Sequence, residues 1–216
     1  ATRQATREQL VAAAQRRLAA MLAHGATTVE AKTGYGLDLP SELKMLSAVA
    51  ELNRAQPVRI VPTLMPAHAT PPEFSNRSDD FIDLVVTSIL PAACSAIQGA
   101  PPFCDVFCDQ GAFTLEQARR VLLAAKALGM RLKIHADEFA HLGGARLAAE
   151  LGAISAEHLA VTPRDDMAAM AEAGVIGVLL PGTTFGLGST HYARARDMIE
   201  CGMAVALGTD LNPGTC

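Results

Sequence analysis

Short apolar segments alternate with amphipathic segments along this chain, and the alternation restricts its fold more than any other feature. Strands are expected at residues 26–32, 58–64, 103–107, 131–134, 153–156, 175–180 and 203–207. Helical spacing and helix-end signals predict helices at residues 6–23, 41–55, 79–90, 114–129, 143–151, 162–174 and 192–201. Such alternation is typical of right-handed βαβ units and a parallel sheet.

Three helix starts carry recognisable signals. Ser41 follows Pro40 and is the expected N-cap of the second helix. Thr114 and Gln117 form a capping-box pattern. Thr162, followed by proline and acidic residues, is the expected N-cap of a later helix. The helix at residues 79–90 is expected to be disturbed at Pro91.

A closed barrel and an open, doubly wound sheet would both satisfy the alternation. No G-x-G-x-x-G or Walker sequence follows any expected strand, and the unusual polar residues follow many strands instead of one switch point. We therefore predict the α/β class and a (β/α)8 TIM barrel, with residues 1–216 forming a single, incomplete catalytic domain. Because the chain starts on a helix and offers seven strands, we expect strands 2 to 8, without the first strand and the last helix.

Composition excludes several classes of protein. The net charge is −4 and the basic residues are scattered, which argues against nucleic acid as a partner. No apolar run reaches the length of a membrane span. The five cysteines are odd in number and lack paired spacing, so a reducing cytoplasm fits best. Cys104 and Cys108 share one face of an expected strand with Val106, and we expect them to pack in the core.

Polar residues follow most of the expected strands. Strand ends meet on one face of a parallel barrel, where that fold builds its active sites, so these residues can form one site. Two glycines around Tyr35 permit a sharp turn, and prolines stiffen the loop around His68. The residues concerned are Tyr35, His68, His135, His158 and Asp210.

The segment after residue 134 is the most informative of these strand ends. It leads an apolar strand directly into His135, Asp137 and Glu138. Imidazole is the commonest ligand of zinc or iron, and a carboxylate three residues later can move protons without binding the metal. Near the next strand end, Glu157 and His158 should point to opposite faces if the strand continues through both.

Other polar residues receive simpler interpretations. Asp109 and Gln110 are expected to be ordinary loop residues, His24 and His141 to be structural, and the role of His191 stays open. The glycine-rich stretch at residues 181–188 lacks the Lys-Ser/Thr of a phosphate loop. We expect it to be a mobile active-site loop in which Thr183 touches the substrate.

Six segments together resemble the imidazolonepropionases, a family of metal-dependent amidohydrolases with a TIM barrel of the metal-dependent hydrolase type. They are Lys32-Thr-Gly-Tyr-Gly-Leu-Asp38, Ala67-His68-Ala, His135-Ala-Asp-Glu138, Gly152-Ala-Ile-Ser-Ala-Glu-His158, Leu179-Leu-Pro-Gly-Thr-Thr184 and Thr209-Asp-Leu-Asn-Pro-Gly214. In that family one zinc or iron ion is held by a His-x-His pair on the first strand, a histidine on the fifth and an aspartate on the eighth. The last two match His135 and Asp210. No His-x-His occurs in the sequence, so the resemblance implies that the first strand lies outside it.

The resemblance also implies a reaction, the hydrolysis of the ring amide of 4-imidazolone-5-propanoate to N-formimidoyl-L-glutamate in histidine degradation. The family's substrate contacts match Tyr35, His68, Glu138, His158, Asn212, Gly214 and Thr215. Asp210 would take a proton from water activated by the ion, and Glu138 would pass a proton to a ring nitrogen. His158 and His68 would orient the ring carbonyl, and Tyr35 would hold the propanoate.

The implied partner is a small-molecule substrate, with neither nucleic acid nor a membrane, and a homodimer is a possible assembly. Two alternatives stay open. A related amidohydrolase, such as a cytosine or guanine deaminase, would share the metal ligands but need other substrate contacts. A non-catalytic barrel fragment would bind or assemble without a metal. We expect residues 1–216 alone to be inactive, because half of the implied metal ligands are absent from them.

Overall fold

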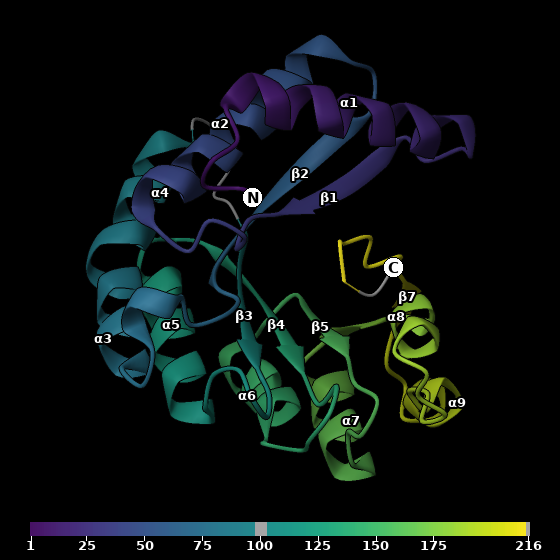
Figure 1. The fold of residues 1–216 in the computed structure, drawn as a ribbon. Coiled ribbons are helices and arrows are strands. Elements are labelled where there is room, and N and C mark those ends of the chain that lie inside the picture. Colours follow the sequence, from purple (N-terminus) through teal and green to yellow (C-terminus); the bar gives the residue numbers. More distant parts are fainter. Residues whose placement is uncertain (98–102, 215–216) are drawn as a thin grey trace.

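Seven parallel strands form one curled sheet in the computed structural model, which describes residues 1–97 and 103–214 (Figure 1). Every strand pairs in parallel with its neighbour in the chain, in the order β1-β2-β3-β4-β5-β6-β7. All seven expected strands are present. Their bounds are β1 (Thr28–Lys32), β2 (Arg59–Ala67), β3 (Phe103–Cys108), β4 (Arg131–Ala136), β5 (Ser155–His158), β6 (Ile176–Leu179) and β7 (Val205–Leu207).

Helices cover the outer, convex face of the sheet (Figure 1). A doubly wound sheet would reverse its strand order at a switch point. Here the order follows the chain without reversal, so the partial barrel is confirmed and the open alternative is excluded. The helices are α1 (Arg7–Ala23), α2 (Leu39–Ala55), η1 (Pro72–Phe74), α3 (Ser78–Leu84), η2 (Val85–Ile89), α4 (Leu90–Ala96), α5 (Leu115–Ala127), α6 (Gly144–Leu151), α7 (Arg164–Glu172), α8 (Pro181–Gly186) and α9 (Ala195–Glu200).

Two of the expected helix caps are wrong, and one is confirmed. Helix α2 begins earlier than expected, because the carboxylate of Asp38 accepts the backbone N–H of Ser41 at 2.7 Å and caps the helix. Pro163 is the N-cap of α7, and the Thr162 hydroxyl donates instead to Asp137 at 2.8 Å. The capping box at Thr114 is present as expected.

The helical segment around Pro91 is longer than the sequence suggested. Helix α3 passes into a turn of π-helix, η2, and continues as α4 to Ala96. Proline cannot donate a backbone hydrogen bond, so an irregular turn before it is reasonable. The expected disturbance is therefore real, but it precedes Pro91 and does not end the helix.

Most of the core lies between the sheet and its helices. The main cluster includes Phe81, Val121 and Ile134, all fully buried, and a smaller cluster packs α1 and α2 against β1 and β2. Cys104, Val106 and Cys108 lie together in the main cluster, as their shared strand face predicted. Among the residues that the structure describes, no helix has the length and apolar character needed to cross a membrane.

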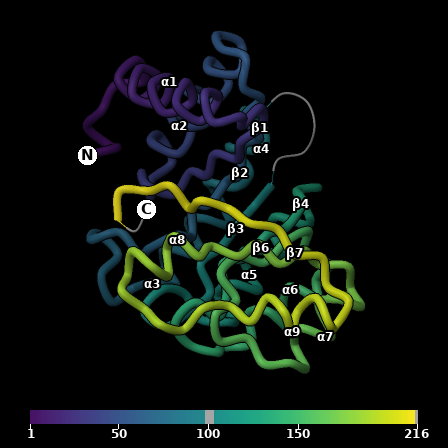
Figure 2. The backbone as a smooth tube through the Cα atoms, turned by 90° about the vertical axis from the view of Figure 1, so that its right-hand side faces the viewer, coloured from purple at the N-terminus to yellow at the C-terminus, as the bar shows by residue number. Residues whose placement is uncertain are grey.

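The two outer strands, β1 and β7, do not pair with each other. Residues after β7 instead run across the open side of the sheet, between the β1 and β2 region and the β7 and α8 region (Figure 2). This course brings the segment that contains Asp210 towards the end of β1. The polar residues that follow the strands can therefore meet in one region.

Candidate active site

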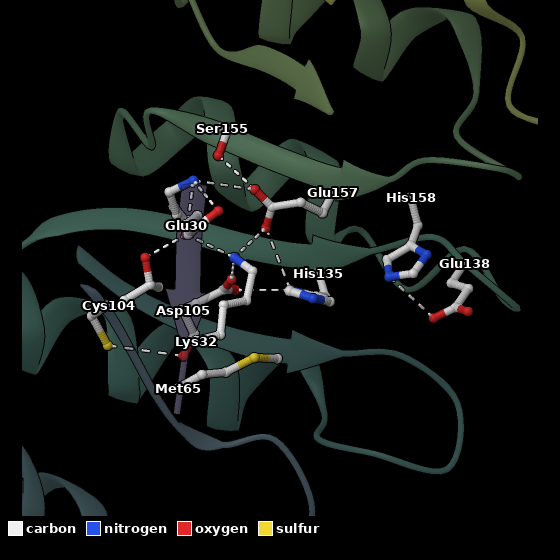
Figure 3. A network of polar contacts seen from close by, with 12 residues as sticks. Glu30, Lys32, Met65, Cys104, Asp105, His135, Glu138, Ser155, Glu157 and His158 are labelled. Atoms are coloured by element: carbon white, nitrogen blue, oxygen red, sulfur yellow. Dashed lines mark hydrogen bonds and ion pairs between the residues drawn. The ribbon is translucent and has the colours of Figure 1, made fainter. Parts of the chain in front are cut away.

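The carboxyl ends of β4 and β5 bring His135, Glu138 and His158 together (Figure 3). The two imidazole rings lie 5.2 Å apart, and Nε2 of His158 is 3.5 Å from Oε2 of Glu138. All three side chains are largely buried. Three residues that the sequence singled out thus lie in one constellation.

His158 reaches this position because the strand ends there. Its backbone φ is +74°, in the left-handed region, so the simple alternation of a strand does not continue through it. Glu157 Oε2 lies 3.4 Å from Nδ1 of His135, while the His158 ring packs beside the same imidazole. The condition for opposite faces, a strand that continues regularly through both residues, is therefore not met, and both residues adjoin His135.

Burial moves the pKa values of the two groups nearest the candidate reaction centre in opposite directions. Burial raises the pKa of Glu138 to about 7, with the charges of Asp210 and Asp109 adding to the effect. Burial lowers the pKa of His158 to about 3, and the neighbouring His135 lowers it further. Near neutral pH, Glu138 can therefore give or take a proton while His158 stays neutral.

A buried ionic network surrounds His135 on its other side (Figure 3). Nδ1 of His135 lies 3.1 Å from Oδ1 of Asp105 on β3, and Asp105 Oδ2 lies 2.7 Å from Nζ of Lys32 on β1. Burial opposes ionisation of Asp105, but His135 and Lys32 outweigh it and hold its pKa well below the usual value. The network therefore joins three strands and fixes the orientation of the imidazole.

Within residues 1–97 and 103–214, one group of side chains has the composition and spacing of a metal site. Asp105, His135 and Glu157 offer ligand atoms that all lie within 4.8 Å of one another. Oε2 of Glu157 is buried without a hydrogen-bond partner, and imidazole with carboxylate suits zinc or iron. The donor groups present, imidazole and carboxylate, are therefore of the kind that binds a divalent metal ion. Lys32 already supplies a positive charge beside Asp105 and lies 3.6 Å from Glu157.

Aromatic contacts extend the site from His135 towards β1. The ring centroids of Tyr35 and His68 lie 5.0 Å apart, those of His68 and Phe107 6.2 Å, and those of Phe107 and His135 5.9 Å. Nδ1 of His68 lies 2.9 Å from the carbonyl oxygen of Gly34 and so attaches the two strand-end loops to each other. The structure thus brings Tyr35 and His68 into the same region as His135 and His158.

Asp210 approaches the site from the segment after β7. Its Oδ2 accepts a hydrogen bond from the Thr183 hydroxyl at 2.6 Å, and its charge raises the pKa of Glu138 in addition to burial. Asn212 donates to the backbone oxygen of Asp210, and Gly214 N–H donates to Asn212. Within the described residues, no hydrogen bond or ion pair joins Asp210 to His135, so their shared role as metal ligands stays a prediction. Thr215 lies outside the described residues.

Residues 181–186 form a short helix, so the expectation of a loop is wrong over that part of residues 181–188, while the mobility of the segment stays a prediction. Pro181 begins the short helix α8, where its fixed φ suits the first helical position. Thr183 is 2% exposed and donates to Asp210, so it supports that aspartate instead of facing open space. A cavity of about 460 Å³ lies beside this helix, and its lining includes Glu138, His158 and His191. That volume suits a small-molecule ligand.

Two buried aspartates that matter to the site were missed or misjudged from sequence. Asp105 lies inside an apolar strand, and its charge between buried neighbours was an available signal. Asp109 is 2% exposed and accepts backbone hydrogen bonds from Glu138, Phe139 and Ala140, so the expectation of an ordinary loop residue is wrong.

His24 and His141 lie at the surface and make the structural contacts that were expected of them. His24 lies at the exposed end of α1 and contacts the carbonyl oxygen of Ala20. His141 pairs with Asp166 at 2.9 Å on the surface of α7.

A model of the amidohydrolase family matches residues 1–216. The chain belongs to this family. An imidazolonepropionase of Alkaliphilus metalliredigens is 52% identical over 216 residues, which are 100% of this chain and 51% of that protein. An imidazolonepropionase of Streptococcus gordonii is 48% identical, and the match covers 69% of its length. The resemblance inferred from the six segments is thereby confirmed, although the amidohydrolase chain spans about half the length of several curated relatives.

Solved structures support the fold of the amidohydrolase chain. A 5-methylcytosine deaminase from Klebsiella pneumoniae superposes with a TM-score of 0.73 at 13% identity, over 99% of this chain and 55% of the deaminase. An atrazine chlorohydrolase from Arthrobacter aurescens, complexed with zinc, gives 0.68 at 18% identity, over 94% of this chain and 49% of the other. At these identities the likeness concerns the fold alone.

Proposed function

We propose that this amidohydrolase chain carries a large part of the active site of an imidazolonepropionase. The reaction is hydrolysis of the ring amide of 4-imidazolone-5-propanoate to N-formimidoyl-L-glutamate in histidine degradation. The proposal rests mainly on the pair of Glu138 and His158, which face each other and line the cavity. The Glu138 carboxyl has a pKa of about 7, and His158 is neutral. Relatives that are 48–52% identical bear the same name, which supports the choice of substrate.

The proposed cofactor is one divalent zinc or iron ion, held by His135 and Asp210 among the residues of this chain. Nδ1 of His135 faces Asp105, which leaves Nε2 as the metal-binding nitrogen. A histidine that binds a metal commonly donates its other N–H to a carboxylate. Lys32 beside Asp105 argues against the ion lying between Asp105 and Glu157 themselves. Such an ion, when bound, activates a water molecule for attack on a carbonyl carbon.

Other side chains of this chain have proposed roles in proton transfer and substrate binding. The carboxylate of Asp210 takes up the proton of the attacking water, and Glu138 delivers a proton from Oε2 to a ring nitrogen of the substrate. His158, neutral at physiological pH, hydrogen-bonds the ring carbonyl oxygen together with His68. Tyr35, which is 42% exposed, binds the propanoate together with residues 212, 214 and 215.

The cavity and the cysteines support a proposed partner and a proposed compartment. The proposed partner is a small-molecule substrate, which the cavity beside Glu138 can accommodate. Four cysteines in the described part of the chain are free thiols, and unpaired thiols are typical of the reducing cytoplasm that we propose.

Turnover and metal content, measured on the complete gene product, test the proposal. We expect hydrolysis of imidazolonepropionate, bound zinc or iron, and loss of both in His135→Ala and in Asp210→Ala. His24→Ala is the matched control, because this histidine is exposed on α1 and should leave both unchanged. Retention of metal and turnover in His135→Ala would contradict the assignment.

The same assays separate the alternatives. Turnover of cytosine or guanine without hydrolysis of imidazolonepropionate would indicate a deaminase. A complete gene product with neither bound metal nor any turnover would indicate a non-catalytic barrel.

A further inference from the structure

The carboxylate of Asp109, at the end of β3, binds the loop that follows the next strand. Its Oδ2 accepts the backbone N–H groups of Glu138 at 2.7 Å and Phe139 at 3.1 Å. Its Oδ1 accepts the N–H of Ala140 at 2.9 Å and that of Gln110 at 2.7 Å. Asp109 is 2% exposed, so water does not compete for these bonds. One buried side chain therefore holds three consecutive amides.

The loop that Asp109 holds is the one that carries Glu138. Just before it, Asp137 has a φ of +54°, and its carboxylate accepts the Thr162 hydroxyl at 2.8 Å. The loop is thus held on both sides of Glu138, by Asp109 just after β3 and by Thr162 just before the N-cap of α7. Only the side-chain torsions of Glu138 remain to be set, and its carboxyl lies against His158.

We propose that Asp109 is a positioning residue that fixes the backbone of Glu138, so that the Glu138 carboxyl faces His158 and the cavity. This inference rests on the proposed function, in which Glu138 transfers the proton. Asp109 itself bonds to backbone amides and does not line the cavity. A carboxyl group suits this task, because its two oxygens can accept several N–H groups at once.

A second carboxylate provides a matched comparison within the same chain. Glu42, fully buried in the first turn of α2, accepts the N–H groups of Gly34 at 2.9 Å, Gly36 at 3.1 Å and Leu37 at 2.9 Å. These residues surround Tyr35, which we assign to substrate binding. The two carboxylates use the same chemistry on two loops with different proposed roles.

The test compares Asp109→Asn with Glu42→Gln in the complete gene product. Each substitution keeps the shape but replaces one acceptor oxygen by an NH₂ group that faces an N–H. We expect Asp109→Asn to lower kcat by on the order of 10²-fold, because small displacements of a catalytic group have effects of this size, with little change in KM. Glu42→Gln should mainly raise KM. Asp83→Asn, on the exposed side of α3, should change neither.

Hydrogen exchange measured by mass spectrometry supplies a readout that does not depend on activity. In Asp109→Asn the amides of residues 138–140 should exchange faster while those of residues 34–37 keep their rates, and Glu42→Gln should give the reverse. If Asp109→Asn does not fold, Asp109→Glu takes its place, since it keeps the charge but shifts the acceptor oxygens by one methylene.

Two results would overturn the inference. One is an unchanged kcat in a variant whose Glu138 loop exchanges faster. The other is an equal effect of the Asp109 and Glu42 variants on kcat and KM, which would indicate general loosening. Wild-type protein without turnover would refute the proposed function instead, and the exchange rates would then still decide whether Asp109 holds the loop.

Discussion

The central strands and the outer strands of this sheet support the site unequally. All four residues of β5 are buried, and β4 is buried from Ile134 to its end. In β7 Leu207 is 76% exposed, and β1 contains only exposed and half-buried residues. The central strands carry His135, Glu138 and His158, whereas Tyr35 and Asp210 follow the outer ones. His135 and His158 thus lie in well-buried strands, while Asp210 follows an exposed strand and depends on a few polar contacts.

Hydrogen bonding explains part of this difference. A central strand is bonded along both edges, whereas β1 and β7 each have one partner strand in the described chain. Side-chain contacts that reach past the neighbouring strand can therefore add to the attachment of an outer strand. Lys32 provides such contacts for β1 by reaching Asp105 on β3 and Glu157 on β5.

The largest effect on stability is expected from Lys32→Met. This change leaves fully buried Asp105 without its closest cation, and breaking a buried ion pair typically costs about 3–5 kcal/mol. The free energy of unfolding is measured by urea titration. Arg77→Met is the control, because Arg77 pairs with Asp80 at the surface, where such pairs contribute below about 1 kcal/mol. Equal losses in the two variants would mean that Lys32 does not tie β1 to the centre.

A smaller and more variable effect is expected from truncating the same residue type in the centre and at the edge. Leu132→Ala on β4 removes a side chain that is 3% exposed and should cost about 2–5 kcal/mol. Leu207→Ala on β7 should change stability by less than about 0.5 kcal/mol. Similar losses at both positions, measured by the same titration, would remove the contrast between the strands.

Glu138 should make the stability of metal-free protein depend on pH. Because its pKa is raised from 4.5 to about 7 in the folded state, folded protein holds this proton more tightly than unfolded chain does. Wild-type stability therefore loses a contribution as pH rises from about 4.5 to 7. The stability of Glu138→Gln relative to wild type, measured by thermal unfolding, should therefore be higher at pH 8 than at pH 5. A difference that is equal at both pH values would show that burial does not perturb Glu138.

The smallest perturbation is chemical labelling of thiols in the native protein. Cys104 and Cys108 on β3 are fully buried, and burial raises the pKa of Cys108 to about 12, so both should resist an alkylating reagent. Cys94 and Cys201 are partly exposed and should react first. Mass spectrometry of the peptides reports each site separately. Early labelling of Cys104 would show that the central strand opens more readily than its burial suggests.

The sequence predicted the strands and the central site because those signals are local. Apolar runs located all seven strands, and a histidine or carboxylate directly after such a run located His135 and Glu138. The roles of Asp109 and Glu42 could not be found in this way. Whether a carboxylate faces solvent or three amides depends on which backbone the fold brings to it, and Asp109 binds amides about thirty residues away.

Helix ends show the same limit at short range. Asp38 and Ser41 are both good capping residues, and the local sequence does not say which of them accepts the hydrogen bond. The left-handed φ of His158 was also outside the reach of a pattern-based prediction, because a positive φ is uncommon for any residue other than glycine. Both errors concern a choice between similar local conformations that tertiary contacts decide.

The strand order has a consequence for how the chain is made. Each strand from β2 onward pairs with the one that precedes it in sequence, so a partner already exists when a ribosome releases the next strand. Any other strand order would pair strands that are further apart in the sequence, which would slow assembly. During synthesis the growing sheet therefore exposes a single advancing edge, and the histidines and carboxylates of the site are added to it one strand at a time.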